Sequence, residues 1–198
     1  MIRSDREYRN IGTFALNGDN DSMVEGYAST FERYLLGRFN DVDYFERIDP
    51  HAFDECDLSD VIFLRDHEGR VLARTRNRSV TLWVDDKGLA NRTDLSLTEA
   101  SRAMLEDIKV GNYTQMSFSF KVAEGGDFLD SDNTRVITRI KKVYDISAVA
   151  FPANPTTGIG ISARDALNGV IEARKTAERL KRQKELRIRT LLSRTGQI

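Results

Sequence analysis

The sequence is poor in cysteine and histidine, and each scarcity limits the chemistry that the protein can perform. Cys56 is the single cysteine of the 198 residues, which excludes an internal disulfide and a cysteine-based zinc site and is typical of a reducing compartment. It is also a poor nucleophile, because the acidic residues around it in the segment 54–57 would raise the pKa of its thiol. With only His51 and His67 present, any mechanism that needs an imidazole base has two candidates.

Long hydrophobic runs and the familiar nucleotide and zinc motifs are also missing. No run reaches the roughly 18 apolar residues of a membrane helix, and the N-terminal segment lacks the apolar core of a signal peptide. The sequence contains no GxxxxGKS/T loop, no GxGxxG after a strand, no HExxH and no GxSxG elbow. We therefore expect a cytosolic protein that uses no cofactor or metal and has no membrane partner.

Charge is distributed unevenly along the chain, although the formal net charge is only -1. From residue 163 to the end there are ten Lys/Arg and four Asp/Glu, a charge of +6, which leaves -7 for residues 1–162. The composition of this end predicts a helix that is too sparsely apolar to be stable alone, so we expect it to dock on something or to fray. These boundaries predict a flexible N-terminal end (1–22), a folded domain (23–162) and a basic helical tail (163–198).

Short apolar or alternating stretches separated by turn residues predict a sheet in the central part of the chain. The first ordered strand is expected near Met23, after the turn-rich segment 17–21. One helix is predicted between the capping-box residues Ser96 and Glu99 and the terminating Gly111. Strands that follow one another through turns favour antiparallel pairing. The predicted strands lie in the segments 23–31, 61–64, 71–75, 79–86, 115–122, 134–140 and 142–151.

The stretch QMSFSF at residues 115–120 raises a functional question. Its apolar residues alternate strictly, so that Ser117 and Ser119 share the opposite face of the predicted strand. Serines on such a face usually meet solvent. The alternative is that one hydroxyl lies within reach of a histidine and a carboxylate, as nucleophilic serine catalysis requires.

The histidine and the carboxylate each have candidates in the sequence. His67 follows an apolar strand, where a side chain is held firmly yet projects beyond the sheet, whereas His51 follows a proline in a polar loop and has the character of a surface or capping residue. Asp145 lies among apolar and small residues, so it is expected to be buried and to need a cationic partner. An imidazolium or an arginine such as Arg139 could be that partner, and both possibilities stay open at this point.

Several segments, taken in order, resemble one protein family. They are GYASTF, a strand followed by DHE, DDKGLA, a helix that ends in glycine, MSFSF and DISAVAFPANP. Together they resemble the prohead (capsid maturation) serine proteases of tailed bacteriophages, a family similar in fold to the herpesvirus assembly proteases. The resemblance covers about residues 23–160. It implies an α+β fold, a mostly antiparallel β-barrel with a few surrounding helices, followed here by the basic C-terminal helix.

The resemblance also implies a role for three residues. The family's histidine falls on His67, its nucleophile on Ser117 and its acidic residue on Asp145. In this assignment Ser117 attacks, His67 takes and returns the proton, and Asp145 orients the imidazole. The oxyanion donors are expected on the loop after Pro152 or on an arginine-bearing loop.

The family implies a serine endopeptidase that cleaves the scaffold or the scaffold segment of the capsid protein, and also itself, inside the procapsid in the host cytoplasm. The basic tail would target the enzyme to an acidic scaffold, or it would be a solvated helix or a self-cleaved remnant. Two alternatives stay open: a catalytically inactive, scaffold-binding assembly module, and a hydrolase of another lineage that uses Ser119. No nucleic-acid partner is expected, because the tail lacks interleaved aromatic residues. The sequence leaves homodimer formation open.

Overall fold

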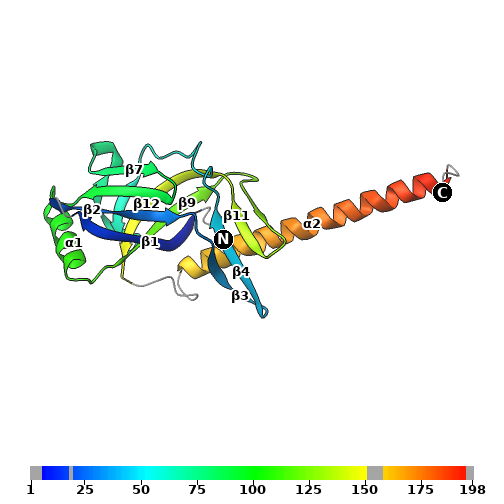
Figure 1. Ribbon diagram of the computed structural model, residues 1–198, viewed down its shortest axis with the longest axis horizontal. Helices are drawn as coiled ribbons and strands as arrows, with labels where there is room; N and C mark the ends of the chain where they lie inside the picture. Colours follow the sequence, from blue (N-terminus) through cyan, green and yellow to red (C-terminus); the bar gives the residue numbers. More distant parts are fainter. Residues whose placement is uncertain (1–5, 18–19, 151–157, 195–198) are drawn as a thin grey trace.

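The protein, seen here as a computed structural model that describes residues 6–17, 20–150 and 158–194, is built mainly of strands. In the described residues the strands precede and follow one short helix, and a long helix is the last element (Figure 1). This composition agrees with the predicted α+β class. The elements are β1 (Glu7–Asn17), β2 (Asn20–Thr30), β3 (Tyr34–Phe39), β4 (Val42–Ile48), β5 (Ile62–Arg65), β6 (Glu68–Arg74), the 3-10 turn η1 (Thr75–Asn77), β7 (Val80–Val84), β8 (Gly88–Asp94), α1 (Glu99–Lys109), β9 (Gln115–Val122), β10 (Asp127–Leu129), β11 (Thr134–Ile137), β12 (Ile140–Val149) and α2 (Gly158–Arg194).

The larger sheet has eight strands in the order β6-β5-β12-β9-β1-β2-β8-β7, and it is curled (Figure 1). The pair of β12 with β5 is parallel, and the other pairs are antiparallel. The two edge strands β6 and β7 are consecutive, but no ladder joins them within the described ranges. The Arg74 amide bonds instead to Ser79 Oγ at 2.8 Å, and the Thr75 amide bonds to the Val61 carbonyl oxygen at 2.9 Å. The predicted barrel is therefore corrected to an open half-barrel. It does not close because these two amides bond to Ser79 and Val61 and not to β7.

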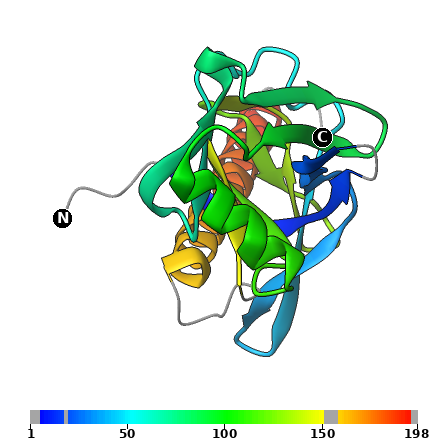
Figure 2. The same cartoon turned by 90° about the vertical axis from the view of Figure 1, so that its left-hand side faces the viewer.

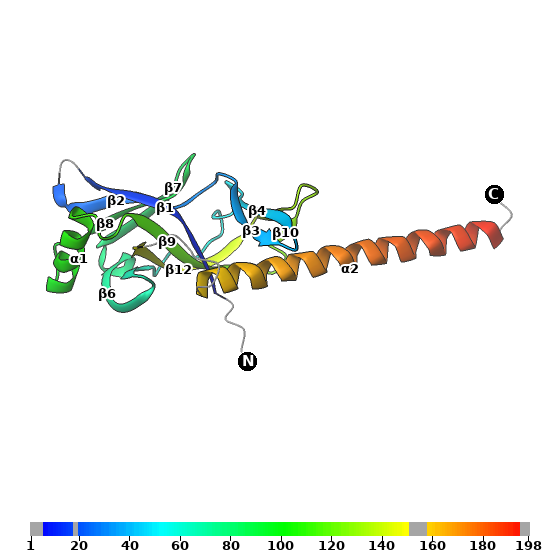
Figure 3. The same cartoon turned by 90° about the horizontal axis from the view of Figure 1, so that it is seen from below.

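A second sheet of four strands, in the order β10-β11-β4-β3, lies beside the first turns of α2 (Figure 3). Its β11 and β4 are parallel, and its outer pairs are antiparallel. A small apolar cluster joins this sheet to the helix. It contains Leu36, Phe39, Tyr44, Leu129, Leu167, Val170 and Ile171.

The main core lies inside the curl of the larger sheet, and β9 contributes its apolar face to it. Met116, Phe118 and Phe120 are fully buried, as the alternation predicted, and the last two rings stack with centroids 4.5 Å apart. Helix α1 adds Met104, Leu105 and Ile108 to the same core. Figure 2, which looks onto the end of the molecule that carries α1, shows this helix in front of the sheet. Its N-cap is Thr98, whose side chain accepts the Ser101 amide at 3.1 Å, rather than the predicted Ser96.

The prediction that the first strand begins near Met23, after a flexible end, is wrong. Strand β1 begins at Glu7 and lies in the middle of the larger sheet, between β9 and β2. Its sequence looked unordered because it carries polar residues, but Arg9 is only 2% exposed and is paired with carboxylates. Gly12 marks a close approach of β2, since a Cβ at this position would lie 2.0 Å from the Tyr27 carbonyl oxygen.

Helix α2 agrees with the predicted tail helix but begins earlier, at Gly158, and runs to Arg194. Its first turns dock through Leu167 and Val170, which are 1% and 7% exposed. The later turns project away from the body (Figures 1 and 3). No helix in the part of the chain that the structure describes is long and apolar enough to cross a membrane.

Candidate active site

The register of β9 against β12 gathers four polar side chains on one face of the larger sheet. Ser117 lies opposite Ser147, and Ser119 lies opposite Asp145, whereas the intervening pair, Phe118 with Ile146, faces the core. Opposite residues of an antiparallel pair point to the same face. All four polar residues are at most 2% exposed. Their hydroxyls and the carboxylate must therefore find hydrogen-bond partners inside the protein.

His67 reaches this face from the hairpin turn between β5 and β6. The turn consists of Asp66 and His67, both with positive φ, 48° and 61°. Two consecutive left-handed residues suit a type I′ hairpin, in which Asn-Gly is preferred, and each side chain other than glycine costs about 1–2 kcal/mol there. Because β5 is parallel to β12, the turn lies beside the end of β12, where the Asp66 amide donates to the Ala148 carbonyl oxygen at 3.0 Å.

The imidazole connects the nucleophile candidate to the acid candidate. His67 Nε2 lies 2.6 Å from Ser117 Oγ, and His67 Nδ1 lies 2.5 Å from Asp145 Oδ1. The structure thus brings together the three residues that the sequence singled out. Ser119 takes a different partner, since its hydroxyl donates to the other carboxylate oxygen, Asp145 Oδ2. Tyr8 packs edge-on against the imidazole, with ring centroids 4.8 Å apart.

The charge of Asp145 is stabilised by its neighbours. Burial by itself raises the pKa of this carboxyl, but the hydrogen bond and charge of His67 and the hydroxyls of Ser119 and Ser147 lower it, and the net pKa is below the ordinary value. Asp145 therefore stays ionised at neutral pH. An ionised carboxylate on Nδ1 fixes the ring proton there and leaves Nε2 as the acceptor, which a general base requires.

The other residues weighed in the sequence lie outside this constellation. Arg139, considered as a partner for Asp145, donates instead to the Glu124 carbonyl oxygen at 2.8 Å. His51 is exposed and bonds to Asp54 at 3.1 Å. Burial raises the pKa of the Cys56 thiol to about 12, in agreement with a poor nucleophile. The loop after Pro152, one of the predicted sources of oxyanion donors, lies outside the described residues.

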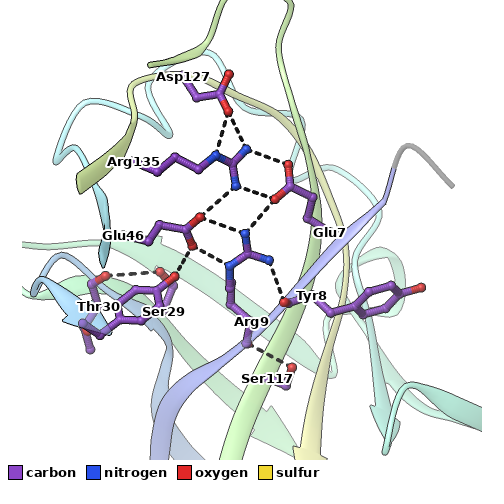
Figure 4. Close-up of polar contacts among 10 residues, drawn as sticks. Glu7, Tyr8, Arg9, Ser29, Thr30, Glu46, Ser117, Asp127 and Arg135 are labelled. Atoms are coloured by element: carbon purple, nitrogen blue, oxygen red, sulfur yellow. Dashed lines mark hydrogen bonds and ion pairs between the residues drawn. The ribbon is translucent and has the colours of Figure 1, made fainter. Parts of the chain in front are cut away.

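A second contact of Ser117 leads into a buried ion-pair network that sequence reasoning missed. The Ser117 hydroxyl donates to the Arg9 carbonyl oxygen at 2.9 Å (Figure 4). The Arg9 guanidinium donates to Glu46 through Nε at 2.5 Å and through Nη2 at 2.8 Å. Arg135 shares Glu46 with it, at 2.7 Å. The network is completed by Glu7, Asp127 and Tyr34.

The network keeps Glu46 ionised although the residue is fully buried. Burial raises the pKa of this carboxyl, but Arg9 and Arg135 outweigh it and hold the pKa at about 2. Its members come from β1, β3, β4, β10 and β11. No local pattern in the sequence links residues that are so far apart, so their pairing could not be predicted.

A hydroxyl, an imidazole and a carboxylate joined in this order are the side-chain arrangement of a serine hydrolase. The family model of the caudovirus prohead serine proteases matches residues 10–170, which is most of the chain, and the protein belongs to this family. The match begins well before residue 23 and so includes most of β1. Searches of curated proteins and of solved structures found no match. The predicted likeness to the herpesvirus assembly proteases stays a prediction.

Proposed function

We propose that this serine protease is an endopeptidase of prohead maturation in which Ser117 attacks the peptide bond, His67 transfers the proton and Asp145 orients the imidazole. The observation that carries the proposal is the chain of hydrogen bonds from Ser117 Oγ through both ring nitrogens of His67 to Asp145, with distances of 2.6 and 2.5 Å. Each residue stands on or beside a strand of one sheet, so the geometry is held by a rigid element.

The reaction follows from the positions of these atoms. As Ser117 Oγ bonds to the scissile carbonyl carbon, His67 Nε2 accepts the hydroxyl proton, and Asp145 stabilises the imidazolium. Nε2 then gives this proton to the amine as the C–N bond breaks, which leaves an acyl ester on Ser117. A water molecule attacks that ester while Nε2 takes its proton. Nε2 returns the proton to Ser117 Oγ as the carboxylic acid leaves.

The Arg9 carbonyl gives the Ser117 hydroxyl a second place for its single hydrogen. When His67 is charged, Nε2–H donates to Oγ, and the hydroxyl hydrogen points to the Arg9 oxygen at 2.9 Å. When His67 is neutral with its proton on Nδ1, the hydroxyl hydrogen can turn to Nε2. Only the second arrangement prepares the nucleophile, so cleavage is expected to fail in acid.

The substrates proposed for the enzyme are the scaffold protein, the scaffold segment of the capsid protein and the protease itself, cleaved inside the procapsid in the host cytoplasm. Membership of the prohead protease family supports this choice. The test is co-expression of wild-type or Ser117→Ala protein with the cognate capsid and scaffold proteins, with intact mass measured for every chain. Cleavage by the wild type alone is expected. Equal cleavage by Ser117→Ala would overturn the assignment.

One observation favours a second candidate, an inactive scaffold-binding module. Ser117 is 0% exposed in this conformation, so a substrate reaches it only after the groups that cover it move. A fluorophosphonate probe, which forms a covalent adduct with an activated serine, separates the two candidates. An adduct that wild type forms and Ser117→Ala does not form supports the enzyme. An unlabelled protein that still binds the scaffold protein without cleaving it supports the module.

We assign the projecting part of α2 a targeting role, as a docking surface for an acidic helical segment of the scaffold. Residues 174–194 carry nine Lys/Arg and two Glu. Leu180, Ile188 and Leu191, which are 48–57% exposed, continue the helix face that lines a groove of about 690 Å³ beside β10 with Ala173 and Ala177. A basic helix with an apolar stripe fits an acidic amphipathic helix better than it fits a phosphate backbone.

A further inference from the structure

Ser147 contacts both the base and the acid of the proposed triad. Its hydroxyl lies 3.1 Å from Asp145 Oδ1 and 3.2 Å from His67 Nδ1, and it accepts the backbone amide of His67 at 3.2 Å. The residue is 0% exposed. It lies directly opposite Ser117 in the ladder between β12 and β9. One hydroxyl therefore meets the acid, the imidazole and the main chain that carries the imidazole.

The hydrogens of this cluster can be assigned without conflict. A serine hydroxyl donates one hydrogen bond and accepts two. The His67 amide donates to Ser147 Oγ, and the Ser147 hydrogen goes to Asp145 Oδ1, which belongs to an ionised carboxylate. The Nδ1 hydrogen of His67 then points to the same carboxylate oxygen. Asp145 Oδ1 thus receives two donors, and Asp145 Oδ2 receives Ser119.

The backbone conformation of His67 makes its hydrogen bond to Ser147 important. His67 is held in the left-handed region with φ 61°, in a turn that glycine would adopt more easily. Its amide lies in the turn between the two strands, since β5 ends at Arg65 and β6 begins at Glu68. The Ser147 oxygen satisfies this amide, so the same atom that steadies the carboxylate also fixes the main chain of the turn.

We propose that Ser147 is a positioning residue of the protease, which holds the His67 turn and the Asp145 carboxylate in one fixed relation. The inference rests on the proposed catalytic roles of these two residues. Ser119 differs, because its hydroxyl bonds to Asp145 but not to the main chain of His67. Losing Ser147 would loosen the imidazole relative to both its neighbours. The Asp145 carboxylate would also lose one hydrogen-bond donor, so its negative charge would stabilise the imidazolium more strongly.

The test is Ser147→Ala, with kcat, KM and the pH dependence of kcat/KM measured on a peptide cut by the wild type. A fall in kcat of about tenfold to a hundredfold is expected, with KM little changed, because a small displacement of the base slows the chemical step. The acid limb of the profile should move to higher pH, because the Asp145 carboxylate then stabilises the imidazolium more strongly. Ser101→Ala, which removes another fully buried hydroxyl on α1, is the matched control and should leave the acid limb in place.

The Nδ1 proton of His67 gives a readout that does not depend on activity. In the Ser117→Ala background, its NMR resonance should shift and exchange faster with water when Ser147→Ala is added. A lower melting temperature with unchanged kcat, acid limb and Nδ1 resonance would make Ser147 merely structural and overturn the inference. If Ser147→Ala fails to fold, Ser147→Cys, which is closest in volume and a weak donor, is measured with the same expectations.

Failure of the inference can be told from failure of the proposed function. If Ser117→Ala abolishes cleavage while Ser147→Ala behaves as wild type, the catalytic triad is supported and the positioning role of Ser147 is contradicted. If Ser117→Ala still cleaves the substrate, the proposed catalytic triad is contradicted, whatever the result for Ser147→Ala.

Discussion

Ser117 and Arg9 are joined by a hydrogen bond from the serine hydroxyl to the arginine carbonyl oxygen at 2.9 Å, and the guanidinium of the same arginine lies in the buried ion-pair network (Figure 4). Strand β1 is therefore bound at one residue to both the nucleophile candidate and the network. Between Arg9 and Gly12 the register of β1 against β9 shifts, which is the position of a β-bulge opposite Ser117. The network helps to fix this irregular stretch of backbone.

The buried ion-pair network predicts that the free energy of unfolding decreases at acidic pH. Glu46 has an ordinary pKa of 4.5 and a folded pKa of about 2, so its ionised form contributes stability that is complete above the ordinary value and is lost as pH falls toward 2. Glu46→Gln should lower the free energy of unfolding at neutral pH by about 3–5 kcal/mol, because Arg9 and Arg135 lose a buried partner. It should also flatten the pH dependence of stability between about 4.5 and 2. Urea unfolding at several pH values measures both effects.

The matched control for Glu46 is Asp43→Asn. Asp43 pairs with Arg38 at 2.8 Å, but both side chains are largely exposed, at 43% and 66%. This substitution should cost less than about 1 kcal/mol. Equal losses for the two variants would mean that the buried network adds no more than a surface pair does.

The two serines of β9 predict opposite outcomes in a cleavage assay. Ser117→Ala should abolish cleavage, because the atom that attacks is gone. Ser119→Ala removes one donor to Asp145 and should lower kcat by no more than about tenfold. Both variants are compared by initial rates on one peptide. The reverse order would move the nucleophile to Ser119 and support a hydrolase of another lineage.

Asp145→Asn should lower kcat by about 10⁴-fold while KM changes little. An amide at this position can donate to Nδ1 and so favours the imidazole tautomer with its proton on Nε2, which cannot accept the proton of Ser117. Asp54→Asn, which alters the partner of the exposed His51, is the control and should leave kcat unchanged. A small loss for Asp145→Asn would assign the orientation of His67 to another group.

The targeting role of α2 predicts that binding and chemistry can be separated by truncation. Removal of residues 164–198 would also delete Leu167 and Val170, which pack against the body. Truncation after Ala177 keeps them, so peptide cleavage should persist while the amount of protease packaged into proheads falls severalfold. The triple variant Leu180→Ser, Ile188→Ser and Leu191→Ser keeps every charge and tests the apolar stripe alone. Wild-type packaging of the truncated protein would remove the targeting role.

The parts of the fold that could be predicted are those with a local signal. The alternation of Met116, Phe118 and Phe120 predicted β9 and its buried face, and Gly111, with φ 81°, marked the end of α1. Strand β1 could not be predicted, because Glu7 and Arg9 read as solvated until their partners from β4 and β11 are known.

The candidate site shows the same division. Spacing alone left Ser117, His67 and Asp145 as open alternatives, and the family resemblance assigned their roles. The contribution of Ser147 had no sequence signal, because an alternating strand does not reveal which residue of β9 it faces. Nor does a sequence say that His67 adopts a positive φ, since the turn Asp66-His67 lacks the glycine that usually announces this conformation.

The straight run of α2 beyond the body has a geometric consequence. From Arg174, whose guanidinium reaches the Asp130 carbonyl oxygen at 3.4 Å, to Arg194 the helix extends by about 30 Å at 1.5 Å per residue. A helix, unlike a flexible linker, holds its far end and the catalytic site at a fixed distance from each other. If the end of the helix is bound to a partner, the catalytic site reaches only peptide bonds that lie at about this distance from the binding point. Peptide bonds directly beside the binding point are then not cleaved.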